Sequence, residues 1–178
     1  MEQILQLRIP PLPQFLTGGH AVWPVGRQHF ERSFNVYVLL IVCQGTFYMT
    51  ENGVSYSIQE GQMLLLEPGK VHFGHKACEE PTEIYWIHFK HTEAIEQFTG
   101  KELPLSVTVK EGDDSDLQPR EQYVYLPKYK ALELPAIKPT LDKILELRKM
   151  LPMEHAIDLQ VILGKLLSQL QASLRSEQ

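Results

Sequence analysis

The sequence predicts a mainly β fold followed by two C-terminal α-helices. Twelve prolines and eleven glycines lie mostly before residue 140 and divide that part at short intervals, as short strands joined by turns require. Beyond residue 140 the apolar residues instead recur at helical spacing. With 178 residues, 43% of them hydrophobic, the chain has the size of one globular domain with a sizeable core. We therefore expect no second large domain.

A buried strand and a hairpin are predicted in the first third of the chain. Residues 35–43, NVYVLLIVC, are almost continuously apolar, which favours a strand buried on both faces. Residues 45–50 alternate in polarity, and the dipeptide at 52–53, Asn-Gly, is typical of a type I′ hairpin turn. The strand that returns from this turn is expected to begin at Val54.

Three more strands are predicted with less regular connections. Residues 63–66 and 71–73 are apolar and flank a Pro-Gly turn at 68–69. Residues 83–90, EIYWIHFK, are rich in aromatic and β-branched residues. A period of two puts one set of side chains of this strand on one face and the alternate set on the other. The first set is Ile84, Trp86 and His88, and the second is Tyr85, Ile87 and Phe89.

The remaining β segment is expected between residues 100 and 130. We predict a strand at 105–110, an exposed acidic loop after it, and a closing strand at 123–126. At the other end, residues 1–19 combine apolar residues with three prolines and two glycines. This mixture predicts an extended N-terminal arm over 1–19, so that the barrel occupies 20–135.

Two helices are predicted over residues 136–178. Pro139 suits the first turn of one helix, and Pro152 with Met153 is expected to start the other. The second helix carries an apolar stripe that is core or interface; part of it must pack on the chain's own barrel, and we expect its remaining edge to pair two copies of the chain. Its members are Leu159, Ile162, Leu163, Leu166, Leu167 and Leu170.

Charge and hydropathy restrict the possible partners. A net charge of −5 and a pI near 5.8 give no broad attraction to nucleic-acid phosphates or anionic lipids. No apolar run approaches the roughly 20 residues that span a bilayer, and the N-terminus has no signal-peptide pattern. We expect a cytoplasmic protein without a membrane segment, in which Cys43 and Cys78 stay reduced.

The segment GQMLLLEPGKVH carries a family resemblance. Gly61, Gly69 and His72 have the spacing of the second cupin signature, with Glu67 where the first proline would stand and Pro68 after it. The pattern resembles the ligand-binding domain of AraC-type transcription regulators over roughly residues 20–95. This resemblance implies a cupin-like double-stranded β-helix, or jelly-roll barrel, with the two helices at the dimerisation end.

The metal ligands of enzymatic cupins are not found in the sequence. If Gly45 is the glycine of the first cupin signature, the glutamate position falls on Val38 and the histidine positions near 31–34, where no histidine stands. A first-row metal site generally needs three or more suitable ligands. We therefore expect no metal and no other cofactor, and we find no catalytic motif.

The resemblance implies a site for a small polar effector of sugar-like kind. The expected ligand-binding residues are His20, Arg27, Arg32, His72, Trp86 and His88. Structural alternatives stay open for all of these except His88. His72 can donate to a backbone carbonyl of its turn, Trp86 can be plain core, and the residues before the first buried strand, His29 included, can be solvated loop residues.

Three functions compete at this stage. The leading hypothesis is the effector-sensing and dimerising half of a transcription regulator that contacts DNA only through a helix-turn-helix domain absent from this chain. A stand-alone metal-dependent isomerase or dioxygenase and an inert sugar-binding sandwich are the alternatives. Fold alone does not decide among them.

Overall fold

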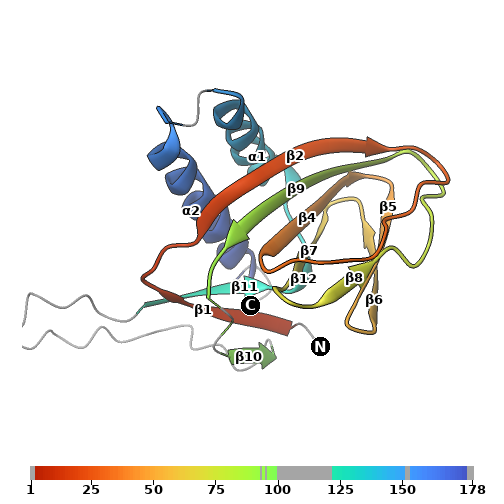
Figure 1. The fold of residues 1–178 in the computed structure, drawn as a ribbon, viewed down its shortest axis with the longest axis horizontal. Coiled ribbons are helices and arrows are strands. Elements are labelled where there is room, and N and C mark those ends of the chain that lie inside the picture. Colours follow the sequence, from red (N-terminus) through yellow and green to blue (C-terminus); the bar gives the residue numbers. More distant parts are fainter. Residues whose placement is uncertain (1–2, 93, 95, 100–121, 151–152, 176–178) are drawn as a thin grey trace, which may run out of the picture.

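Three antiparallel sheets and two helices make up the computed structural model (Figure 1), which describes residues 3–92, 94, 96–99, 122–150 and 153–175. The strands are β1 (Gln3–Ile9), β2 (Gln14–Trp23), β3 (Arg32–Ser33), β4 (Tyr37–Gln44), β5 (Thr46–Glu51), β6 (Val54–Gln59), β7 (Gln62–Leu66), β8 (Val71–Phe73), β9 (Thr82–Lys90), β10 (Glu96–Thr99), β11 (Gln122–Pro127) and β12 (Tyr129–Ala131). The helices are α1 (Leu134–Lys149) and α2 (Ala156–Ser173). The predicted strand at 105–110 and the acidic loop lie outside the described residues.

A five-stranded sheet with the order β12-β7-β4-β9-β2 divides the molecule into two cores. On one face it packs against the four-stranded sheet β3-β8-β5-β6, and the two sheets form the barrel. On the other face it packs against α1, α2 and the three-stranded sheet β10-β1-β11. The predicted fold class, a jelly-roll barrel followed by two helices, is confirmed.

Strand β4 shows why the central sheet is apolar on both faces. Its first six residues are all buried, as the continuous run from 35 to 43 predicts. Leu39 and Ile41 belong to the core under the helices, whereas Val38 and Leu40 belong to the core between the two barrel sheets. β4 pairs with β7 on one side and β9 on the other, so neither edge is exposed.

The predicted hairpin is confirmed between β5 and β6. Asn52 and Gly53 have φ angles of 47° and 82°, the left-handed conformation that a type I′ turn requires at both central positions. The turn sets the register in which Glu51 pairs with Val54 and Phe47 pairs with Ile58.

The N-terminal segment differs from the predicted arm. Residues 3–9 form β1, which lies between β10 and β11, and β2 begins at Gln14 and pairs with β9. Ile4, Leu5 and Leu7 are completely buried. The three prolines fall in or beside the connection between the two strands, where they remove no ladder hydrogen bond from the strand centres. The segment is therefore part of the core.

Both helices start at other residues than predicted. α1 begins at Leu134 with Pro135 in its first turn, so Pro139 lies inside the helix. Pro139 is tolerated there because the apolar stripe, which includes Ile137, Leu141 and Ile144, holds the helix against the core. α2 begins at Ala156, after Met153, and Pro152 lies outside the described residues.

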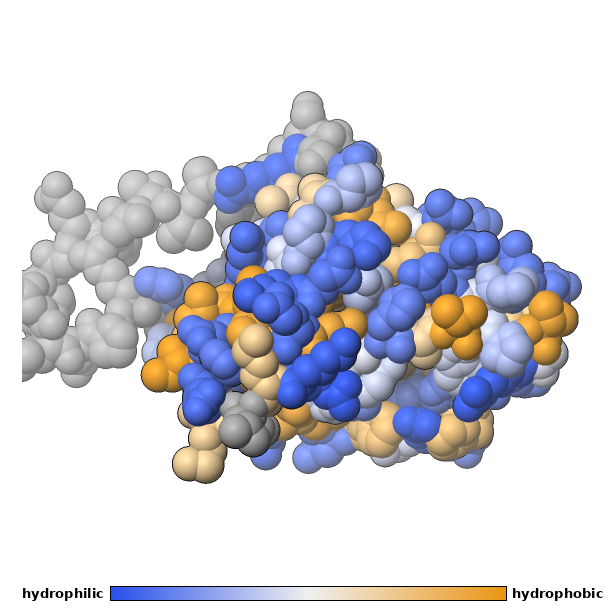
Figure 2. All heavy atoms as spheres, turned by 90° about the horizontal axis from the view of Figure 1, so that it is seen from above, coloured by the Kyte–Doolittle hydropathy of each residue, from blue (hydrophilic) through white to orange (hydrophobic). Residues whose placement is uncertain are grey.

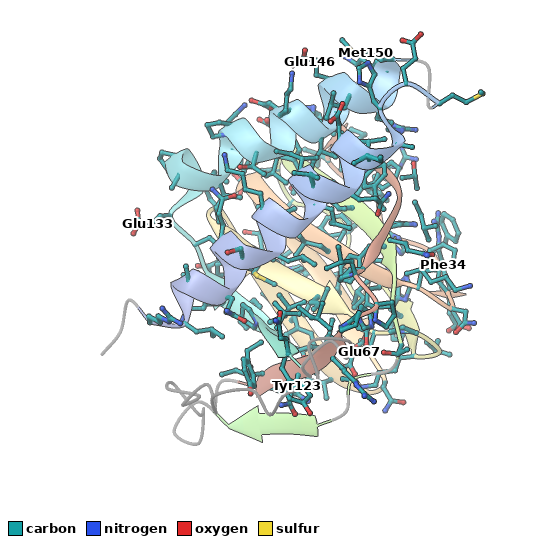
Figure 3. The ribbon with its side chains drawn as sticks, turned by 90° about the vertical axis from the view of Figure 1, so that its left-hand side faces the viewer. Phe34, Glu67, Tyr123, Glu133, Glu146 and Met150 are labelled. Atoms are coloured by element: carbon teal, nitrogen blue, oxygen red, sulfur yellow. The ribbon has the colours of Figure 1, made fainter. Side chains whose placement is uncertain are left out.

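The predicted dimerisation stripe is turned inward. Leu159, Leu163, Leu166, Leu167 and Leu170 are buried within the chain itself, and Ile162 packs partly buried against the same core. Figure 3 shows α2 lying across the sheets beside α1, whose ends are marked by Glu133 and Met150. These side chains pack against the chain's own sheets. We therefore assign them to the core and not to a dimer interface, which corrects the prediction.

Polar residues of α2 fasten the helix to two strands. The Gln160 side chain accepts a hydrogen bond of 2.8 Å from the backbone N–H of Phe15 in β2. The Gln171 side chain accepts one of 2.7 Å from the backbone N–H of Tyr125 in β11. These bonds satisfy strand N–H groups that have no strand partner on that side.

A buried ion cluster lies where the β11–β12 junction meets the ends of β5 and β7. Lys128 is 2% exposed and contacts the carboxylates of Glu51 and Glu67, which are 3% and 8% exposed. Glu51 Oε1 also accepts a bond of 2.6 Å from the backbone N–H of Glu67. Burial acts to raise the pKa of Glu67, but Lys128 and Lys70 outweigh it and lower that pKa. The cluster ties β5 and β7 to the β11–β12 junction.

The described surface has no large apolar region in the view from above, and the two cysteines are not bonded to each other. Seen from above, the molecule shows apolar side chains in small groups between hydrophilic ones (Figure 2). Within the described residues, no helix is both long enough and apolar enough to cross a bilayer. Cys43 and Cys78 are both free thiols.

Candidate functional site

A cavity of about 290 Å³ lies between the two sheets of the barrel. Its described lining contains two arginines and three histidines, framed by four large aromatic side chains and several aliphatic ones. The cationic and titratable members are Arg27, Arg32, His29, His72 and His88. The large aromatic members are Trp23, Phe34, Phe47 and Trp86. Figure 3 shows Phe34 at the margin of the barrel, on the side away from Glu133.

Strand β9 supplies one wall, as its period of two predicts. Ile84, Trp86 and His88 line the cavity, whereas Tyr85, Ile87 and Phe89 belong to the core under the helices. The rings of Trp86 and His88 lie 5.2 Å apart, and His88 lies 5.3 Å from the ring of Phe34. These three rings form a continuous aromatic surface.

A close approach of β2 to β9 makes room for the indole of Trp86. Gly19 pairs with Trp86, and a Cβ atom added at Gly19 would lie 2.5 Å from the indole Cζ2. Any larger residue at position 19 would therefore push the indole out of its place. The absence of a side chain at Gly19 lets Trp86 extend over the edge strand.

The opposite wall is the segment of residues 24–34, which strand β8 holds in place. The backbone N–H of Gly69 donates to the carbonyl of Phe34 over 2.8 Å, and that of Gly74 donates to His29 over 2.9 Å. A Cβ atom at Gly74 would lie 2.8 Å from the backbone nitrogen of His29. The Pro-Gly turn before β8 thus anchors the segment from which Arg32 reaches the cavity.

Arg32 and His72 are neighbours and both carry an unsatisfied atom. They pair directly across β3 and β8. The buried Nε of Arg32 and the buried Nδ1 of His72 have no hydrogen-bond partner within the described structure. His72 is only 3% exposed. The Arg32 guanidinium lies 3.8 Å from the centroid of the Phe30 ring.

Burial keeps the histidines of the cavity neutral near pH 7. Burial, the largest cause, together with the neighbouring Arg32 and His72 outweighs a hydrogen bond with Phe30 and lowers the pKa of His29 to about 4. Burial also lowers the pKa values of His72 and His88, with Arg32 contributing to both. Each neutral imidazole offers one N–H donor and one acceptor nitrogen.

Five of the six predicted ligand-binding residues meet at this cavity. Arg27, Arg32, His72, Trp86 and His88 all line it. His20 does not. It pairs in register with Tyr85, its Nε2 lies 2.7 Å from the Glu83 carboxylate, and its ring is tilted against the Tyr85 ring with the centroids 4.8 Å apart. The parity of β2 turns His20 towards the helix side, which the sequence alone did not indicate.

Four further ring-bearing residues of the cavity lining, His29, Trp23, Phe34 and Phe47, are not among the predicted ligand-binding residues. The sequence favours a solvated loop position for His29, but its ring lines the cavity and lies 5.6 Å from the His72 ring. Trp23 packs on His29 at 5.8 Å and on Phe47 at 5.1 Å. Neither Phe34 nor Phe47 belongs to a motif, so no signal in the sequence could identify them.

Histidine and carboxylate side chains do not form a metal cluster in the part of the chain that the structure describes. No three His, Cys, Asp or Glu residues there are placed to hold one ion. The groups at the cavity are suited to binding a small molecule, since they combine aromatic faces with neutral imidazoles and guanidinium groups.

Residues 24–126 match the model of the AraC-like ligand binding domain. The match covers more than half of the chain, and the chain belongs to this family. A Bacillus subtilis (strain 168) protein described as the uncharacterized HTH-type transcriptional regulator YisR is 43% identical over 93 residues, which are 52% of this chain and 32% of that protein. The chain therefore spans about a third of the length of the curated relative it matches.

Solved structures of low sequence identity were also found. One is an RmlC-like cupin with a double-stranded β-helix fold from Methanocaldococcus jannaschii, with 20% identity, coverage of 45% of this chain and 80% of that chain, and a TM-score of 0.39. Another is the plu4264 protein from Photorhabdus luminescens, with 21% identity, coverage of 48% and 73%, and a TM-score of 0.38.

Proposed function

We propose that this chain is the effector-sensing part of a cytoplasmic AraC-type transcription regulator. The observation that carries the proposal is the cavity between the barrel sheets, lined by aromatic and polar side chains within the family domain. The relative from Bacillus subtilis, described as a transcriptional regulator, supports the regulatory role. In this proposal DNA is contacted by a domain outside this chain.

The effector is a small polar molecule, a sugar or a sugar derivative. The Trp86 indole offers an apolar face on which one side of a sugar ring can stack. His29, His72 and His88 are neutral and can exchange hydrogen bonds with hydroxyl groups. A cavity of about 290 Å³ is at the lower end of the size range of small-molecule sites.

The regulator acts as a homodimer in which the outer face of α2 meets its counterpart. Ile157 and Val161 are 77% and 67% exposed on this helix, and Met153 just before it is 94% exposed. They are separate from the inward leucine stripe. Burying such side chains against a second copy removes apolar surface from water.

Thermal unfolding of the chain in the presence of sugars, sugar acids and sugar phosphates tests the sensing role. A compound at 100 times its dissociation constant should raise the free energy of unfolding by about 2.7 kcal/mol. Loss of this effect in Trp86→Ala would assign it to the cavity. If no compound of the three classes stabilises the chain, the proposal is wrong.

The regulatory role needs the whole protein that contains this domain. A stabilising compound should change transcription from a promoter controlled by that protein, and Trp86→Ala should abolish the response while the protein still accumulates. Unchanged transcription in spite of tight binding would leave a sugar-binding domain without a regulatory role.

A further inference from the structure

We propose that the effector carries an anionic group, a carboxylate or a phosphate, which Arg32 and His72 bind together at the β3–β8 side of the cavity. This inference rests on the proposed function and narrows it. It concerns the chemical class of the effector, because a neutral sugar and a sugar acid make different demands on the same cavity.

The charged side chains in the described cavity lining are all positive. Two arginines line it, and no aspartate or glutamate is found among its described lining residues. Glu51 pairs with His72 across β5 and β8, but its carboxylate is engaged by Lys128 and by the backbone N–H of Glu67. Glu51 is therefore not free to neutralise Arg32. An anionic ligand would supply the missing charge.

The buried polar atoms without hydrogen-bond partners also indicate the β3–β8 side of the cavity as the anion site. Buried polar atoms are nearly always hydrogen-bonded, so each exception needs an explanation. Within the described structure, two of the exceptions, Arg32 Nε and His72 Nδ1, belong to side chains that line this cavity and are paired across two short strands. A carboxylate or phosphate has several acceptor oxygens and can accept from a guanidinium and an imidazole at once.

Arg32 is held ready for this contact. Its guanidinium carbon lies 3.8 Å from the ring centroid of Phe30 and 5.3 Å from that of Phe34, so aromatic rings flank the charge. The planar guanidinium matches carboxylate and phosphate oxygens in a forked geometry. Arg27 differs, because its guanidinium stacks on Trp23 at 4.7 Å and the residue is exposed.

His72 makes the binding dependent on protons. Its buried Nδ1 has no hydrogen-bond partner in the described structure, and burial lowers the pKa of the ring. The neutral ring has one N–H donor and one acceptor nitrogen, whereas the protonated ring donates from both nitrogens. Burial is the largest influence against protonation of His72, Arg32 and Lys128 also oppose it, and the Lys70 backbone and Glu51 favour it. The His29 ring lies 5.6 Å from the His72 ring and is neutral near pH 7. An anion at Nδ1 shifts the balance, so anion binding takes up a proton.

Matched triples of hexose, hexuronate and hexose 6-phosphate test the proposal, with inorganic phosphate and acetate as probes of the anionic group alone. We expect the charged members to raise the melting temperature of the chain and the hexoses to have little effect. The stronger of the uronate and the phosphate ester identifies the anionic group. Sodium chloride of equal ionic strength corrects for general salt effects.

Two measurements assign the binding to the named residues. Calorimetric titration in buffers of different ionisation enthalpy should show net proton uptake by the wild-type chain, and tighter binding near pH 6 than near pH 8. Arg32→Gln should weaken binding of the charged member by about tenfold or more. Arg175→Gln, an equal charge change at an exposed position at the end of α2, should leave it unchanged.

The outcomes separate this inference from the proposed function. Stabilisation by hexoses, with equal affinity in Arg32→Gln, would overturn the anion proposal and retain the sensing role. Binding of the charged members without proton uptake would overturn the part assigned to His72. If neither hexoses nor charged members bind, the inference and the proposed function are both wrong. Proton uptake is measured on the wild-type chain, so it holds even where a variant fails to fold.

Discussion

Arg148, in the last turn of α1, lies 5.9 Å from the ring centroid of Trp86 and donates a hydrogen bond to the carbonyl of Gly18 in β2. Trp86 belongs to the cavity wall, whereas α1 covers the opposite face of the central sheet. The contact passes around the edge strand because Gly18 and Gly19 carry no side chains. A cavity side chain is thereby linked to the helix end that precedes α2.

Removal of the contact between Arg148 and Trp86 should leave ligand binding intact but reduce the effect of binding on the helices. We expect Arg148→Gln to lower the free energy of unfolding by about 1 kcal/mol, the usual value of one hydrogen bond, and to keep the ligand affinity within about twofold. In the whole regulator the transcriptional response should fall. Lys149→Gln, at the next and exposed position, is the control. An unimpaired response in Arg148→Gln would show that the link carries no signal.

Trp86 should provide a large part of the binding free energy. Trp86→Ala is expected to weaken binding of the stabilising compound by about 1 to 3 kcal/mol, the range for a lost aromatic anchor. In a Trp23→Phe background the remaining indole is that of Trp86, and its emission should change on titration. Unchanged affinity in a folded Trp86→Ala chain would place the residue in the structural core alone.

Acid should destabilise the chain through the histidines of the cavity. Burial lowers the pKa of His29 from 6.5 to about 4, so the unfolded chain binds the proton more tightly. Its contribution is present above about pH 6.5 and is lost as the pH falls towards 4. For a partly exposed ring we expect about 1 kcal/mol between pH 7 and pH 5, after allowing for solvent screening.

The control for this loss of stability is a variant in which residue 29 cannot take up a proton. His29→Gln should flatten the dependence of the unfolding free energy on pH between 7 and 5 relative to the wild-type chain. His72 and His88 are shifted in the same direction and will keep a smaller slope. A steeper slope in the variant than in the wild type would contradict the assignment.

The buried ion cluster predicts a large and asymmetric stability effect. Lys128→Met leaves two buried carboxylates without their shared cation, and it should cost about 3 to 5 kcal/mol in urea unfolding. Lys70→Met removes a more exposed partner of Glu67 and should cost about 1 kcal/mol or less. Equal effects of both variants would mean that the cluster does not hold the barrel end together.

The two faces of α2 should respond differently to the same change. Leu163→Glu puts a charge into the core and should unfold the chain. Val161→Glu changes an exposed residue, and it should leave the melting temperature within a few degrees but convert a dimer to monomers in light scattering. A wild-type chain that is monomeric at about 10 to 100 μM would contradict the proposed homodimer.

The strands with a clear period were predictable from the sequence. The alternation in residues 83–90 separated cavity side chains from core side chains correctly. Both faces of β9 are enclosed, so each side chain lies either in the cavity wall or in the core under the helices. The Asn-Gly turn fixed the hairpin for a local reason, since few residues tolerate two successive left-handed conformations.

Features that depend on pairing between distant segments were not predictable. The side to which His20 points is set by its register with Tyr85. The position of His29 follows from its bond with Gly74, 45 residues later in the chain. The leucines of α2 form the same stripe whether it faces a partner or the chain's own sheets, so only the tertiary structure assigned them to the core.

The alternation along β9 also bears on how such a sensor can change its ligand over evolutionary time. Residues at even positions from 84 to 88 meet the cavity, and the odd positions beside them support the helices. Replacement of one even-numbered side chain can alter recognition while the helix platform keeps its packing. A single strand thus holds two independent sets of constraints, and new specificities can arise on one set without loss of the fold that the other maintains.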